Sequence, residues 1–131
     1  MIGLDTNVIV RYLVQDDARQ SAVANAFVEN TLDAARPGFI GPIVLCELVW
    51  VLEDAYGYRR EQIADALHRL FEVDRFQFED AELAWRALDA YRAGVDFSDA
   101  LIALANERAG CEYTASFDRR AARLPQVRAP A

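Results

Sequence analysis

Apolar and polar residues follow two alternating patterns along the chain, and these patterns predict which segments form strands and which form helices. Short apolar segments, typical of buried strands, lie at residues 2–4, 38–40, 75–78, 111–115 and 126–128. Apolar residues at helical spacing predict helices over 7–14, 18–31, 43–56, 59–72, 81–93 and 98–108. Strands that alternate with helices are typical of an α/β fold whose mostly parallel sheet is covered on both faces.

Glycine and proline fall at short turns, and no repeat or flexible linker divides the sequence. We therefore expect residues 1–131 to form a single domain, large enough to bury one hydrophobic core. Short crossovers between parallel strands bring their carboxyl ends to one edge of the sheet. Open α/β folds build their ligand sites at that edge.

Composition and charge exclude several classes of protein. The longest apolar stretch, 39–52, contains a proline and a glutamate and is shorter than the ~20 residues that span a bilayer. Asp5 interrupts the first apolar segment, so we expect no signal peptide. With two cysteines alone, we expect no disulfide framework and a cytoplasmic location. The net charge of −7 argues against non-specific coating of nucleic acid, although it leaves a nucleic-acid enzyme open.

Three acidic residues stand where strands are predicted to end or helices to begin. Asp5 separates the first strand from the first helix, and a helix cap explains it as well as a ligand role does. Asp99 lies in the first turn of a helix, with Asp96 as a candidate N-cap. Asp118 follows a strand, and a cap on the next turn is the alternative there.

Glu47 is not explained by capping. It lies within the apolar segment 43–52, for which we predict a helix that is apolar on all sides and therefore buried. A buried carboxylate needs a cationic partner, so either an arginine or a metal ion is expected beside it. Since the fold can gather all four acids at one place, we interpret them together as a candidate cation site.

Four segments together resemble the motifs of PIN-domain ribonucleases, most of all the VapC-type toxins of bacterial toxin–antitoxin pairs. These segments are LDTN at 4–7, the apolar helix with Glu47, FSDALIA at 97–103 and TASFD at 114–118. The resemblance spans nearly the whole chain in the same order, and it implies a PIN-like three-layer α/β/α fold. It also implies that Asp5, Glu47, Asp99 and Asp118 are catalytic metal ligands, supported by Thr6, Asn7, Asp96 and Ser116.

Two positions depart from the family pattern. Gly41 stands where many relatives have Ser or Thr, and Ser116 replaces the commoner Thr. Neither change removes a carboxylate, so they concern the groups that support the ligands rather than the ligands themselves.

The resemblance implies metal-dependent hydrolysis of RNA phosphodiester bonds. Crowded carboxylates repel one another, and Mg²⁺ or Mn²⁺ suits an all-oxygen site that retains water. The single histidine, His68, lies among charged residues, so we expect no histidine-based acid–base mechanism. Arg11, Arg119 and Arg120 are candidates for contacts with RNA phosphates, and solvated surface charges are the alternative for each.

Other functions fit less well. A receiver-type phosphorylation switch usually needs a lysine, which the chain lacks, and haloacid-dehalogenase-like phosphatases normally have a second Asp where Asn7 stands. A PIN-like binding module without turnover stays an alternative. If the toxin resemblance holds, the expected partners are a small antitoxin, an RNA substrate and a second copy of the chain, with no membrane.

Overall fold

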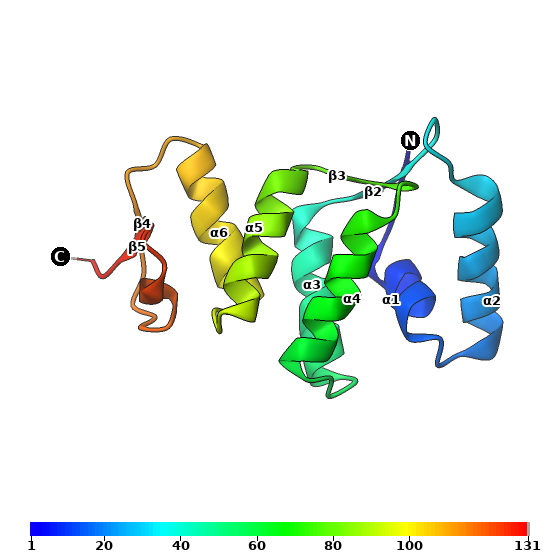
Figure 1. Ribbon diagram of the computed structural model, residues 1–131, viewed down its shortest axis with the longest axis horizontal. Helices are drawn as coiled ribbons and strands as arrows, with labels where there is room; N and C mark the ends of the chain where they lie inside the picture. The colour runs from blue at the N-terminus through cyan, green and yellow to red at the C-terminus, as the bar shows by residue number, and fades with distance from the viewer. Residues whose placement is uncertain (131) are drawn as a thin grey trace. The chain divides into compact units, whose positions relative to one another are not determined.

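The first of two compact units in the chain, Met1–Ala81, contains a three-stranded parallel sheet in the order β1-β2-β3. The computed structural model describes residues 1–130. The strands are β1 (Ile2–Gly3), β2 (Gly38–Ile40) and β3 (Phe76–Phe78), and Gly38 of the central strand pairs with Ile2 and with Phe76. Figure 1 shows the helices of this unit, which are α1 (Thr6–Val14), α2 (Ala18–Ala26), α3 (Pro42–Asp54) and α4 (Arg60–Glu72).

Burial on one face explains why the helices of this unit form where they do. In α4 the buried side chains recur at helical spacing, as an amphipathic helix requires. The helix α3 likewise buries Leu45, Leu48, Val49 and Leu52. Two leucine side chains pack closely against the central strand, so that a Cβ at Gly38 would lie 2.7 Å from Leu4 Cδ1 and 2.8 Å from Leu32 Cδ1. Only glycine fits at this position without displacing them.

The second unit, Glu82–Ala131, combines two helices with a small parallel sheet. Its elements are α5 (Ala81–Arg92), which starts at the boundary, α6 (Phe97–Arg108), β4 (Thr114–Ala115), a 3₁₀ turn η2 (Ala121–Arg123) and β5 (Val127–Arg128). The strands β4 and β5 pair in parallel. Ala103, Ala121 and Val127 form a small buried cluster that Leu124 partly covers. Gly94, at φ +106°, allows the turn between α5 and α6.

These elements confirm the α/β class and the parallel pairing predicted from the sequence. The predicted strand 38–40 is β2, and the other strands are shorter than predicted. The helix predicted over 18–31 is α-helical to Ala26 and continues as a π-helical turn, η1 (Phe27–Thr31). Every helix within residues 1–130 is too short or too polar to cross a lipid bilayer. That the whole chain forms one domain stays a prediction.

Candidate functional site

Asp5 lies between β1 and α1, as predicted, and it is the N-cap of α1. Its backbone is extended (φ −85°, ψ 158°), and its Oδ1 accepts a 2.7 Å hydrogen bond from the backbone N–H of Thr6. Within residues 1–130, Oδ2 accepts no hydrogen bond. The cap therefore uses one oxygen and leaves the other for a cation, so that capping and ligand binding are compatible.

Thr6 links Asp5 to Glu47 through two different donors. Its side chain is buried, and its Oγ1 donates a 2.9 Å hydrogen bond to Glu47 Oε1, while its backbone N–H serves Asp5. Asp5, Thr6, Asn7 and Glu47 line one cleft of about 340 Å³. The structure thus brings together the predicted site residues of the first unit. The other residues that line this cleft, called the acidic cleft below, are Val10, Arg11, Val51, Ala55 and Tyr56.

The predicted burial of Glu47 is wrong. Glu47 is exposed, and it lies on α3 at helical spacing from Ile43 and Trp50, whose side chains are 76% and 63% exposed. The helix is apolar on most sides, but its buried residues occupy one face only. A continuously apolar segment therefore does not imply that every side of its helix is buried. The hydrogen bond from Thr6, and not burial, is what connects Glu47 with the candidate site.

In the second unit, Asp96 and Asp118 both lie close enough to Asp99 to affect its pKa. Asp96 is the N-cap of α6, and its Oδ2 accepts a 3.1 Å hydrogen bond from the Asp99 backbone N–H, which confirms the predicted cap. Burial raises the pKa of Asp99, and the charges of the neighbouring Asp96 and Asp118 raise it further.

Backbone hydrogen bonds hold the Asp118 carboxylate in a tight turn. Its Oδ1 accepts from the N–H groups of Arg120 at 2.8 Å and Ala121 at 3.2 Å. These bonds to Ala121 and Arg120 hold the pKa of Asp118 below its ordinary value. Ser116 Oγ accepts a 3.0 Å hydrogen bond from the Asp118 N–H. Asp118 thus caps a turn, as the alternative interpretation held, and Ser116 supports that turn.

The candidate phosphate-binding arginines differ in their surroundings. Arg119 and Arg120 are exposed beside Asp118, and the charge of Arg120 contributes to its lowered pKa. Arg11, by contrast, lies in the wall of the acidic cleft and is hydrogen-bonded to three side chains. One of these belongs to Tyr56, which sequence reasoning had not placed in the site. Its only signal was its position directly after the helix of Glu47.

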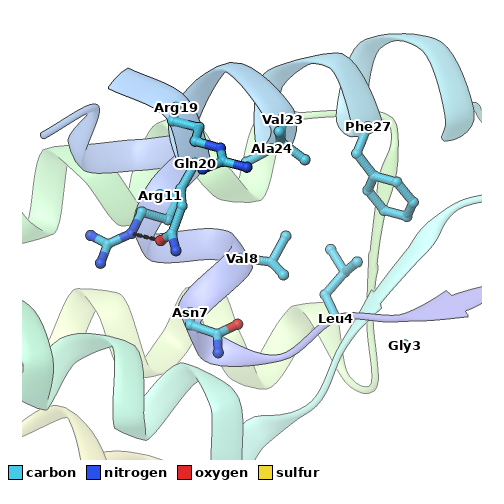
Figure 2. A pocket seen from close by; sticks show the side chains of 10 residues that line it. All are labelled: Gly3, Leu4, Asn7, Val8, Arg11, Arg19, Gln20, Val23, Ala24 and Phe27. Atoms are coloured by element: carbon cyan, nitrogen blue, oxygen red, sulfur yellow. Dashed lines mark hydrogen bonds between the residues drawn. The ribbon is translucent and has the colours of Figure 1, made fainter. Parts of the chain in front are cut away.

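A larger depression of about 500 Å³ lies beside the acidic cleft on the same unit (Figure 2). Leu4, Val8 and Phe27 converge on it, whereas the guanidinium of Arg11 points away from them (Figure 2). Asn7 and Arg11 line both hollows. The depression is apolar and carries no carboxylate among the residues that line it.

The donor chemistry of the acids fits a hard divalent cation. All the side chains concerned offer oxygen, which Mg²⁺ and Mn²⁺ prefer. Within residues 1–130, no three His, Cys, Asp or Glu side chains are grouped so that they could hold a metal ion. His68 forms an exposed 3.3 Å pair with Glu72 on α4, as expected for a surface residue.

Two comparisons with known proteins found relatives of this chain. The family model described as the PIN domain matches residues 2–127. A VapC ribonuclease of Aquifex aeolicus (strain VF5) is 27% identical over 123 residues, which cover 92% of this chain and 90% of that protein. No solved structure matched the chain.

Proposed function

The chain belongs to the PIN-domain family, and from this premise we propose that it is a divalent-metal-dependent endoribonuclease. The observation that carries the proposal is the pairing of Asp5 and Glu47 in one cleft, both held by Thr6. The similarity to a VapC ribonuclease supports the same activity.

The proposed metal ligands are carboxylates, namely Asp5 and Glu47 in the first unit and Asp99 and Asp118 in the second. Bound Mg²⁺ or Mn²⁺ would supply a water of lowered pKa and would stabilise the charge that develops on the phosphoryl oxygens. The attacking oxygen would come from water and the bond from phosphorus to the 3′-oxygen would break, so the products would carry 5′-phosphate and 3′-hydroxyl ends.

The remaining site residues orient these carboxylates. Thr6 fixes Oδ1 of Asp5 and Oε1 of Glu47, which leaves the second oxygen of each acid for a ligand role. Asn7 adds an amide to the wall of the cleft. In the second unit, Asp96 caps α6 by accepting a hydrogen bond from the Asp99 N–H, and Ser116 supports the turn that holds Asp118.

We further propose that the protein is the toxin of a toxin–antitoxin pair and acts in the cytoplasm. The partner would be a small antitoxin that covers the acidic cleft with a basic side chain, because opposite charge favours such a contact. A homodimer is proposed as well. Trp50 and Ile43 on the exposed side of α3 are candidate contacts for it.

The test is cleavage of mixed RNA by the purified protein with Mg²⁺, followed by sequencing of the new ends. The proposal expects cleavage that stops with EDTA and with Asp5→Asn. It also expects wild-type cleavage by Asp74→Asn, which changes an exposed aspartate in the loop before β3. Cleavage that survives excess EDTA contradicts metal dependence. Binding of RNA without any cleavage identifies the chain as a PIN-like binding module.

A further inference from the structure

A ring of hydrogen bonds holds Arg11 in the wall of the acidic cleft. Arg11 Nη1 donates to Asp16 Oδ1 at 2.9 Å and to the Tyr56 hydroxyl at 3.0 Å. The same hydroxyl donates to Asp16 Oδ2 at 2.9 Å, which closes the ring. Arg11 Nε also donates to Gln20 Oε1 at 2.6 Å, drawn as the dashed line in Figure 2.

The ring ties together parts of the unit that are distant in sequence. Arg11 belongs to α1, Asp16 to the turn after it, and Tyr56 to the segment after α3. Ser21 of α2 strengthens the arrangement, because its hydroxyl donates a 2.9 Å hydrogen bond to the Arg11 carbonyl. The guanidinium is therefore fixed from several sides, as a binding group that must not reorganise on contact requires.

The ring of hydrogen bonds favours the ionised forms of both Arg11 and Asp16. The hydrogen bond with Tyr56 raises the pKa of Arg11, and the same hydroxyl lowers the pKa of Asp16. Of the three guanidinium nitrogens, Nε and Nη1 are used, whereas Nη2 takes part in no hydrogen bond within residues 1–130. The hydrogen bonds of Nε and Nη1 already hold the Arg11 side chain in place, so Nη2 is available to a ligand.

The electrostatics of the cleft call for a cation at this place. Asp5 and Glu47 line the same cleft, and the whole chain carries a net charge of −7, so a phosphodiester is repelled on approach. Arg11 is the basic residue among those that line this cleft. Arginine N–H groups bind phosphate oxygens through charge-assisted hydrogen bonds, and the N–H groups of Nη2 stay available for such a bond.

Resting on the proposed ribonuclease function, we propose that Arg11 binds a backbone phosphate of the RNA strand that enters the acidic cleft. Tyr56 and Asp16 are then positioning residues, which act on the substrate through the guanidinium. The ring would set which phosphate lies beside Asp5 and Glu47, and thereby the register of the strand.

The test is binding of a fluorescein-labelled single-stranded RNA of mixed sequence across a series of salt concentrations. All proteins carry Asp99→Asn so that the RNA stays intact. Loss of one phosphate contact should lower the salt slope by about one, so Arg11→Gln should bind roughly 10-fold more weakly at low salt. Tyr56→Phe keeps the charge of Arg11 but removes the hydroxyl that closes the ring of hydrogen bonds. This variant should bind RNA about 3-fold more weakly. Tyr58→Phe is the matched control and should bind as the parent does.

A second readout separates positioning from stability. In the cleavage assay without Asp99→Asn, Tyr56→Phe should raise KM while kcat stays near the wild-type value. If Arg11→Gln and Tyr56→Phe keep the parent affinity and salt slope and only melt earlier, the ring merely stabilises the fold and the inference is wrong. Should Arg11→Gln fail to fold, Tyr56→Phe decides by its affinity, and binding as tight as that of the parent overturns the inference.

Failure of the proposed function gives a different result. A wild-type protein that cleaves no RNA, but binds it with an Arg11-dependent salt slope, refutes the nuclease and leaves the phosphate contact standing. Cleavage with an Arg11-independent slope refutes the contact and leaves the nuclease standing.

Discussion

The two units hold their carboxylates by different means. In the first unit, Asp5 and Glu47 both accept hydrogen bonds from Thr6, a neutral residue that serves each acid with a separate donor. In the second unit, Asp118 accepts hydrogen bonds from the backbone N–H groups of Arg120 and Ala121, and its charge raises the pKa of the neighbouring Asp99. A neutral residue thus joins the two acids of the first unit, whereas in the second unit the charge of one acid acts on the other.

The largest expected effect is that of Asp5→Asn. Asparagine caps a helix about as well as aspartate, so the thermal unfolding midpoint should stay close to that of the wild type. Metal-dependent cleavage should fall by at least about 100-fold, since even indirect partners of metal ligands contribute 10–100-fold. Kinetics and thermal melts on one preparation check both. A variant that loses stability and activity together would identify Asp5 as a cap alone.

Thr6→Val should have the next largest effect, because it removes the hydroxyl donor and keeps the shape of a buried side chain. We expect roughly 10-fold slower cleavage, since Glu47 loses the group that orients it. Thr6→Ser keeps the hydroxyl and should retain most of the activity. Equal losses in both variants would show that the methyl group, rather than the hydrogen bond, matters.

Asp96→Ala tests the second unit through its helix cap. Loss of the 3.1 Å hydrogen bond to the Asp99 N–H should lower the free energy of unfolding by about 1 kcal/mol. Urea denaturation followed by circular dichroism measures this change. Asp96→Asn should restore the stability. An Asn variant as unstable as the Ala variant would mean that the charge of Asp96, and not its cap, stabilises α6.

The smallest expected effect concerns the influence of Asp118 on Asp99. In the metal-free protein, Asp118→Asn should lower the pKa of Asp99, because the charge of Asp118 raises that pKa. The value should stay above the ordinary one, since burial is the largest cause and is unchanged. NMR titration of the side-chain carboxyl carbons gives the answer. An unmoved pKa would show that the two acids are independent.

Much of the architecture follows from local sequence, because strong periodicity fixes the element type. The helix predicted over 59–72 is Arg60–Glu72 in the structure, and the cap at Asp96 follows from its spacing to Asp99. The strands at both ends of the sequence were predicted too long. Strands of two or three residues carry little pattern of their own, and pairing decides where they end.

The contacts of the site are harder to predict than its residues. A carboxylate at position 47 is visible in the sequence, but its exposure depends on which face of α3 meets the core. Tyr56 lies more than forty positions from Arg11 along the chain, and Thr6 lies more than forty positions from Glu47. No local preference specifies such pairs, since they arise only when helices pack.

Gly38 makes the acidic cleft a property of the sheet as much as of its acids. The strand β1 leads into Asp5, and β2 leads into the helix that carries Glu47, so their spacing sets how far apart the two acids begin. A methyl group at Gly38 of β2 would lie within 3 Å of the Leu4 and Leu32 side chains, so the packing around this strand leaves no room for one. In a growth-based screen for inactive proteins, we would look for hits at this uncharged position alongside the carboxylates. Inactivating substitutions would then fall in the sheet that positions the site as well as at the carboxylates themselves.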